Sequence, residues 1–215
     1  MQFIDFLHLV KPYTMTSEAR IKFLFDSLEY IRINNIEGDI IECGVWKGGN
    51  ILGVMEYLHY HRINDKKVWL FDTFSGMTEP EDIDVDLKNV KAIDILDKPI
   101  VLACSPLNEV KNNLAKSNFN SKNLVFVVGD VSETLKIETN IPKKISLLRL
   151  DTDWYKSTKD ELTYLYPNLV KNGVLIVDDY GHWKGSKLAF DEYFASINVK
   201  PKITEIDYTG IGFRK

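Results

Sequence analysis

Five short apolar runs, most of them followed by a segment with helical periodicity, constrain the fold of this chain more than any other feature. The runs are DIIECG (39–44), VWLFD (68–72), NLVFVVGD (123–130), ISLLRLD (145–151) and GVLIVDD (173–179). Their apolar character is continuous rather than alternating, which is typical of strands that helices cover on both faces. Strands that alternate with helices predict an α/β fold with a doubly wound, mostly parallel sheet.

The two ends of the chain depart from this alternation. Residues 17–34 place apolar side chains at steps of three and four, which predicts an amphipathic helix capped by Thr16 or Ser17, within an N-terminal helical segment over 1–37. Near the other end, KITEID and IGFRK flank a Tyr-Thr-Gly turn, which predicts a C-terminal antiparallel hairpin. No internal repeat and no Gly/Ser-rich linker occurs, so we expect one domain over 1–215.

One long segment, 75–105, interrupts the regular pattern between the second strand and the next helix. It carries five acidic residues between Glu79 and Asp86. A solvated acidic loop is the simpler interpretation. The alternative is a lid or a substrate-selecting insertion, because long loops inside compact domains are often functional.

Composition excludes several classes of protein. The formal charge is -4 and the pI about 5.6, which argues against nucleic acid as the partner, because phosphate binding requires a clustered basic face. No run reaches the ~20 apolar residues of a membrane span, and the first ten residues lack the basic start of a signal peptide. Two isolated cysteines fit a reducing cytoplasm. We therefore expect a cytoplasmic protein with a small-molecule or glycan substrate. The sequence does not fix the oligomeric state, although an amphipathic N-terminal helix is compatible with a homo-oligomer.

Carboxylates stand at the end of every predicted strand. In open parallel sheets, ligands bind beyond the carboxyl ends of the strands. The acidic residues that the five strands bring to this edge are Glu42, Asp72, Asp130, Asp151 with Asp153, and Asp178 with Asp179. Their concentration at one edge of the sheet is the strongest functional signal in the sequence.

The first of these strands leads into a glycine-containing turn, ECGVWKGG (42–49). A dinucleotide site prefers a second glycine two residues after the first, whereas here Gly44 and Gly48 are separated by three other residues. This spacing favours a ligand without a pyrophosphate group. Glu42 suits the ammonium group of an amino acid, and the amides at the start of the following helix suit its carboxylate. A purely structural strand-to-helix turn is the alternative.

The next two strand ends extend the same idea. Asp72 is positioned to accept hydrogen bonds from ribose hydroxyls, or to cap the turn that follows it. Asp130 is positioned to accept from an adenine amino group, or to cap the helix that begins at Val131. Amino-acid, ribose and adenine contacts together describe S-adenosylmethionine better than NAD or ATP.

The last two strand ends predict a metal site. If these strands are neighbours, Asp151, Asp178 and Asp179 converge, and three carboxylates so close repel one another unless a cation or protons intervene. An all-oxygen set suits Mg²⁺ or another hard divalent cation rather than zinc. Polar caps at strand ends are the structural alternative.

Two residues are candidates for the general base. Asp153 is the first choice, because it lies two residues beyond Asp151 and would remove the proton of a hydroxyl group that a metal acidifies. His182, in DDYGHW, is the competing candidate.

Several stretches match a known family. They are YTMT (13–16), GDIIECGVWKGGN (38–50), VWLFDTFSGM (68–77), LLRLDTDWYKSTKDELTYLYPNLVKNGVLIVDDY (147–180) and AFDEYF (189–194). In these motifs the chain resembles the TylF-type macrocin and mycinamicin sugar O-methyltransferases. The resemblance implies a Rossmann-like class I methyltransferase fold, S-adenosylmethionine, and Mg²⁺-dependent transfer to a sugar hydroxyl.

The resemblance also implies roles for individual residues. Asp151, Asp178 and Asp179 would be the metal ligands, Asp153 matches a position proposed as the base, and the YTMT segment would fold over the cofactor. The strand ends and the motifs together predict these cofactor-binding residues: Thr14, Met15, Glu42, Gly44, Val45, Trp46, Gly48, Asn50, Asp72, Thr73, Asp130, Val131 and Asp151.

The sequence therefore predicts an S-adenosylmethionine- and Mg²⁺-dependent O-methyltransferase that modifies a sugar or glycoside. Three alternatives remain open at this point. One is a catechol-type or other small-molecule O-methyltransferase, another is a non-catalytic S-adenosylmethionine-binding module, and the third is a nucleotide-dependent oxidoreductase.

Overall fold

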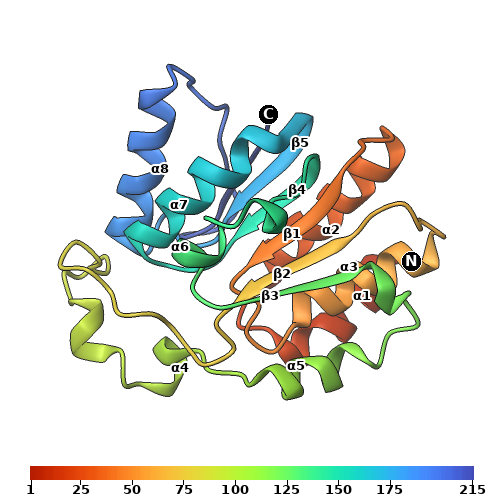
Figure 1. The fold of residues 1–215 in the computed structure, drawn as a ribbon, viewed down its shortest axis with the longest axis horizontal. Helices are drawn as coiled ribbons and strands as arrows, with labels where there is room; N and C mark the ends of the chain where they lie inside the picture. The colour runs from red at the N-terminus through yellow and green to blue at the C-terminus, as the bar shows by residue number, and fades with distance from the viewer.

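A seven-stranded sheet between two layers of helices forms the centre of the computed structural model, which describes residues 1–215 (Figure 1). The strand order is β3-β2-β1-β4-β5-β7-β6. The strands are β1 (Asp39–Cys43), β2 (Val68–Asp72), β3 (Leu124–Val128), β4 (Ile145–Leu150), β5 (Leu169–Val177), β6 (Thr204–Glu205) and β7 (Ile211–Arg214). The first five are parallel, as the continuous apolar runs predict.

The register of the parallel strands aligns their carboxyl ends. Cys43 at the end of β1 pairs with Phe71 on one side and with Leu150 on the other, and Leu150 pairs with Val177. The residues that follow these positions therefore emerge side by side at one edge of the sheet. This alignment places the predicted strand-end carboxylates in one region.

The C-terminal hairpin is confirmed. β7 pairs antiparallel with both β5 and β6, and the turn between β6 and β7 contains Tyr208. The hairpin extends the sheet beyond the last parallel strand.

Helices cover both faces, and each layer has its own apolar core. The main helices are α1 (Phe3–Val10), α2 (Glu18–Ile33), α3 (Gly49–Tyr60), α5 (Leu107–Leu114), α6 (Val131–Thr134), α7 (Tyr155–Leu165) and α8 (Lys184–Ser196). The first four pack on one face, in a cluster that includes Phe6, Leu24 and Leu52. The last three pack on the other face, around Leu162 and Phe190. None of the helices combines the length and apolar character that crossing a membrane requires.

Two boundaries differ from the sequence prediction. The helix expected over 155–170 ends at Leu165 and continues as a short 3-10 turn that contains Pro167. Proline lacks the N–H that a helix interior needs, so the α-helix stops before it. β5 starts at Leu169, four residues before the predicted start at Gly173. Ser17, one of the two expected caps, accepts a hydrogen bond from the backbone N–H of Arg20.

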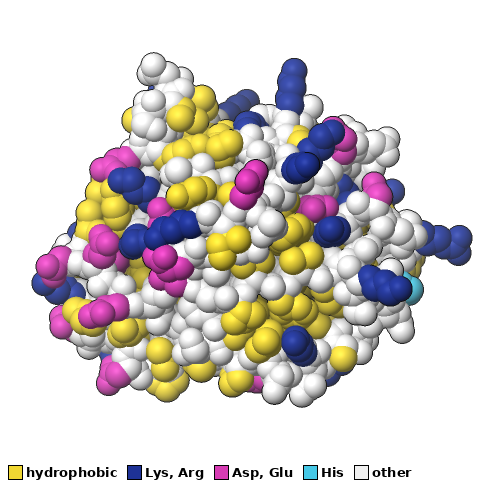
Figure 2. Space-filling view, viewed as in Figure 1, with side chains coloured by type: hydrophobic (Ala, Val, Ile, Leu, Met, Phe, Trp, Pro, Cys, Tyr) yellow, Lys and Arg dark blue, Asp and Glu magenta, His cyan; other side chains and the backbone are white.

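The segment 75–105 is only partly a solvated loop. It contains a 3-10 turn (Ala92–Ile95) and the short helix α4 (Pro99–Leu102). Acidic side chains gather on the side of the molecule where this segment lies (Figures 1 and 2), and Glu81 and Asp82 are exposed. Asp84, in contrast, is fully buried and accepts the backbone N–H of Tyr155 at 2.8 Å. The segment is thus anchored to the start of α7.

Candidate active site

A cavity of about 720 Å³, counted out to its open mouth, lies at the carboxyl ends of the parallel strands. It is lined by residues that follow β1, β2, β3 and β4, and by Met77, Thr78, Ile100 and Ala103 from the segment 75–105. This segment therefore forms one wall of the cavity, as the lid or insertion interpretation requires. No pattern in the sequence indicates which residues of the segment line the cavity.

The glycine turn after β1 is held by Asp72. The carboxylate of Asp72 accepts the backbone N–H groups of Val45 at 2.7 Å and Trp46 at 3.2 Å, and its other oxygen accepts that of Phe74 at 2.7 Å. Burial raises the pKa of Asp72, although the three N–H donors oppose this effect. Asp72 thus caps its own turn, as one interpretation of the sequence held, and it also faces the cavity.

The close approach of β1 and β4 requires glycine at position 44. Gly44 has a φ of 80°, and a Cβ atom there would lie 2.0 Å from the carbonyl oxygen of Asp151. No other residue fits this contact without moving the backbone.

Asp130 begins α6 and caps it. Its side chain accepts the backbone N–H of Ser132 at 2.8 Å, which confirms the capping interpretation, and it also lines the cavity. A carboxylate oxygen has two acceptor positions, so capping leaves Asp130 able to accept a further hydrogen bond.

Most of the predicted cofactor-binding residues meet at this cavity. Those that line it are Met15, Gly44, Trp46, Asp72, Thr73, Asp130, Val131 and Asp151. Those that do not line it are Thr14, Glu42, Val45, Gly48 and Asn50.

Glu42 differs most from its prediction. It is buried below the cavity, where its Oε1 accepts from Asn50 at 3.1 Å and from Arg149 at 2.6 Å, while Oε2 has no partner. In this structure Glu42 therefore does not face the cavity in which the ammonium group of an amino acid would bind. The reason is Arg149, a cation that the turn motif itself does not reveal.

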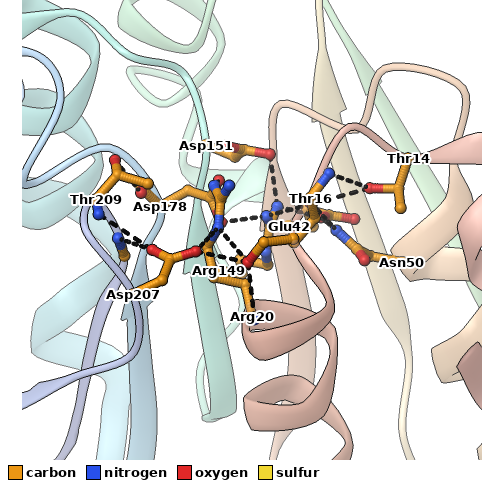
Figure 3. Close-up of polar contacts among 12 residues, drawn as sticks. Thr14, Thr16, Arg20, Glu42, Asn50, Arg149, Asp151, Asp178, Asp207 and Thr209 are labelled. Carbon is orange, nitrogen blue, oxygen red and sulfur yellow. Dashed lines mark hydrogen bonds and ion pairs between the residues drawn. The ribbon is translucent and has the colours of Figure 1, made fainter.

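Arg149 is the centre of a buried polar network (Figure 3). Its guanidinium group, 2% exposed, donates to Glu42, to Asp151 Oδ2 at 2.7 Å, to Asp178 Oδ1 and to Thr16 Oγ1 at 3.1 Å. These three carboxylates keep the pKa of Arg149 well above its usual value, although burial alone would lower it. One arginine thus holds three carboxylates from three strand ends.

A second arginine ties the N-terminal region to this network. Arg20, from the first turn of α2, pairs with the second oxygen of Asp178 and donates to Asp207 at 2.9 Å. Asp207 also accepts from Ser17 at 2.5 Å. The start of α2, the end of β5 and the β6–β7 turn are therefore joined below the cavity.

Asp151 also belongs to a second group of carboxylates, whose other two members, Asp153 and Asp179, form no ion pair with a lysine or arginine. One oxygen each from Asp151, Asp153 and Asp179 lie within 4.8 Å of one another, and the three side chains are half-buried. This set is not the predicted set of Asp151, Asp178 and Asp179, because both oxygens of Asp178 face arginines. We call Asp151, Asp153 and Asp179 the carboxylate triad.

The pKa values of all three carboxyl groups of the triad are raised. Loss of hydration raises the pKa of Asp151 to about 6 and that of Asp153 to about 7, and nearby carboxylates add to both shifts. Loss of hydration and the neighbouring Asp153 and Asp178 also raise the pKa of Asp179 well above its usual value. Such a group of acids suits a bound cation.

The two candidate bases have different surroundings. Asp153 lines the cavity and has a φ of 66°, a left-handed conformation that L residues rarely adopt. His182 does not line the cavity. Its ring packs against Trp183 and Tyr208, and its Nδ1 is buried without a partner. The geometry therefore favours Asp153 over His182.

The strand order and the position of the cavity define the class of protein. A mostly parallel seven-stranded sheet with an antiparallel C-terminal hairpin and a ligand cavity at its carboxyl edge is the class I methyltransferase fold. The structure of the O-methyltransferase NovP superposes on it with a TM-score of 0.82 and 30% identity, over 94% of this chain and 82% of NovP.

The chain belongs to the macrocin-O-methyltransferase (TylF) family, whose sequence model matches residues 9–215, and it is an O-methyltransferase. Two named O-methyltransferases are similar to it in sequence. Demethyldecarbamoylnovobiocin O-methyltransferase of Streptomyces niveus is 31% identical over 94% of this chain and 76% of its own length. Mycinamicin III 3''-O-methyltransferase of Micromonospora griseorubida is 28% identical over 94% of this chain and 78% of its own length.

Proposed function

We propose that the protein transfers a methyl group from S-adenosylmethionine to a hydroxyl group of a sugar or glycoside, with Mg²⁺ or another hard divalent cation. The observation that carries the proposal is the carboxylate triad, of which Asp151 and Asp153 line the same cavity as Asp72 and Asp130. The names of the relatives, which include a mycinamicin 3''-O-methyltransferase, support a glycosidic acceptor.

The cavity suits S-adenosylmethionine in its position and charge. It lies beyond the carboxyl ends of the parallel strands, where open α/β sheets bind their ligands. Asp72 uses three of roughly four acceptor positions on backbone N–H groups, so one remains for a ribose hydroxyl. The carboxylates at this edge outnumber Arg149 and Arg20, and this excess favours a ligand that carries ammonium and sulfonium cations.

The donor set also fits a hard divalent cation. All donors are carboxylate oxygens, and we assign Asp151 and Asp179, which lie together in the carboxylate triad, as two of the ligands. Asp178 is assigned as the third on the family resemblance. Asp178 qualifies despite its two arginines, because each carboxylate oxygen keeps a second lone pair. A bound cation supplies charge compensation for these acids and lowers the pKa of a sugar hydroxyl.

Asp153 is assigned as the general base. Its pKa of about 7 lets its carboxylate accept a proton near neutral pH. In the proposed reaction Asp153 takes the hydroxyl proton while the hydroxyl oxygen forms its bond to the methyl carbon. The bond between that carbon and the sulfonium sulfur breaks at the same time, and S-adenosylhomocysteine leaves with the electron pair. Thr78 and Ile100, from the segment 75–105, line the same cavity and would exclude water from it.

The experiment that tests the donor is thermal unfolding with S-adenosylhomocysteine, with and without Mg²⁺, and with NADH and ATP as controls. A ligand at a hundredfold its Kd adds about 2.7 kcal/mol, which corresponds to roughly 5–10 °C at this chain length. We expect S-adenosylhomocysteine to raise the unfolding temperature and NADH and ATP to leave it unchanged. A shift with NADH instead would favour the oxidoreductase alternative and overturn the proposal.

The acceptor is tested separately, because the same carboxylates would suit a catechol diol. A panel of glycosides and catechols is incubated with labelled S-adenosylmethionine and Mg²⁺. We expect methyl transfer to glycosides only. Transfer to catechols alone would replace the acceptor class and leave the donor assignment intact, while transfer to neither with bound S-adenosylhomocysteine would favour a non-catalytic binding module.

A further inference from the structure

Glu161 is a buried acidic residue that the proposed reaction does not use. It lies in the middle of α7, is 0% exposed, and forms no ion pair with any lysine or arginine. Its Oε1 accepts a hydrogen bond from Thr152 Oγ1 at 2.8 Å, whereas its buried Oε2 has no such partner, and the weakly donating thiol of Cys43 also lies near the carboxyl group. Burying a carboxyl group with one oxygen unsatisfied costs free energy, so its position calls for an explanation.

Its partner, Thr152, lies between Asp151 and Asp153 in the loop from β4 to α7. The carbonyl oxygen of Thr152 accepts from the backbone N–H of Trp154 at 2.8 Å and from Ser157 Oγ at 3.2 Å. Its side chain is held by Glu161. Thr152 is thus fixed at both its main chain and its side chain.

The loop needs this support because its conformation is unfavourable. Asp153 has a left-handed backbone with a φ of 66°, a conformation that is unfavourable for most L residues and that aspartate tolerates better than most. On the β1 side, Gly44 lies directly against the carbonyl oxygen of Asp151. On the α7 side, the hydroxyl of Thr152 and the carboxyl of Glu161 provide the opposing contact. The loop is therefore held between two elements.

We propose that Glu161 is a positioning residue that holds Asp153 toward the cavity through the hydroxyl of Thr152. The inference rests on the proposed function, because it takes Asp153 as the base. Burial raises the pKa of Glu161 to about 8, so near neutral pH it adds no full negative charge to the neighbouring carboxylate triad. A neutral carboxyl can hold Thr152 without increasing the repulsion there.

The test uses the whole chain with four substitutions. Thr152→Val and Glu161→Leu remove the hydrogen bond with little change in volume, and Glu161→Gln keeps an acceptor oxygen. Thr158→Val is the matched control, because it removes a buried hydroxyl of α7 that contacts Ser186 rather than the loop. We expect Thr152→Val and Glu161→Leu to lower kcat about tenfold, with KM for S-adenosylmethionine and Kd for S-adenosylhomocysteine within twofold. Glu161→Gln should keep kcat within about threefold, and the control should match the wild type.

The double variant Thr152→Val/Glu161→Leu shows whether the two residues act as one unit. We expect its kcat to equal that of the single variant with the lower kcat, since a shared interaction is lost only once. Losses that multiply, or a Thr152→Val variant with full kcat, would overturn the proposal. If Glu161→Leu does not fold, as its circular dichroism would show, Thr152→Val alone decides.

A second measurement separates this inference from the proposed function. Hydrogen–deuterium exchange of the 151–157 region is followed by mass spectrometry in the wild type and in Thr152→Val. We expect faster exchange confined to this region, whether or not an acceptor has been found. Unchanged exchange would refute the positioning role, whereas the absence of methyl transfer by the wild type would refute only the proposed function.

Discussion

Asp178 and Asp179 are consecutive residues with opposite surroundings. Asp178 points below the cavity, where Arg149 and Arg20 each take one of its oxygens. Asp179 points to the triad, where its nearest charged neighbours are the carboxylates of Asp153 and Asp178. The difference separates a lower layer, in which two arginines pair with Asp178 and hold the strand ends together, from an upper layer, in which Asp153 and Asp179 have no arginine partner.

The largest effect should follow a change in the upper layer. Asp179→Ala is expected to lower kcat at least 1,000-fold, equivalent to about 4 kcal/mol of transition-state stabilisation, because it removes a proposed metal ligand. Binding of S-adenosylhomocysteine, measured by calorimetry, should stay within a few-fold of the wild type. Full activity in this variant would refute the metal site.

In the lower layer, the expected effect is on stability. Arg149→Met should lower the free energy of unfolding by about 3–4 kcal/mol, because it leaves several buried carboxylates without their cation. Urea unfolding measures the change. The same substitution at Arg32, whose pair with Glu29 is about one third exposed, is the control and should cost about 1 kcal/mol or less. Equal losses in the two variants would remove the distinction between the layers.

Replacing each of the consecutive aspartates by asparagine, which has nearly the same shape, compares the two layers directly. Without ligand, Asp178→Asn should cost about 1–3 kcal/mol, because an amide N–H would face a guanidinium group. Asp179→Asn should leave stability unchanged or raise it slightly, since it relieves repulsion with Asp153. Thermal unfolding in metal-free buffer gives both values, and the reverse order would contradict the comparison.

The smallest expected effect is the change of stability with pH that Glu161 causes. Glu161 is a buried carboxyl group that forms no ion pair with an arginine. In the unfolded chain a glutamate releases its proton near pH 4.3, whereas in the folded chain Glu161 keeps it up to about pH 8. The unfolded state therefore binds fewer protons in this range, and the free energy of unfolding falls as pH rises. Relative to Glu161→Gln, the wild type should lose about 1 kcal/mol per pH unit between pH 6 and 7.5. Parallel curves for the two proteins in urea titrations would show that Glu161 is ionised when folded.

The sequence predicts the sheet well because its signals are local. Continuous apolar runs gave the five parallel strands, and the turn at Tyr208 gave the hairpin. The strand-end acids were also visible, and the structure brings Asp151 and Asp179 together as expected. Helix ends were less accurate, since Pro167 stops α7 before the predicted end.

The lower layer was not predicted, although one signal for it was present. Arg149 is a lone cation within an apolar strand, LLRLD, and a buried strand position requires partners for it. Its contact with Glu42 explains why Glu42 faces away from the cavity. Arg20 gave no such signal, because its partner Asp178 lies 158 residues away along the chain.

The bonds between α2 and the β6–β7 turn also have a consequence for the time at which the site forms during protein synthesis. Ser17 and Arg20 bind Asp207 across 190 and 187 residues of sequence. At about 5–20 residues per second, a ribosome needs roughly 10–40 s to make that length of chain. Asp178, the other partner of Arg20, follows it by 158 residues, so the region below the cavity is completed late in synthesis, when most of the sheet has already emerged.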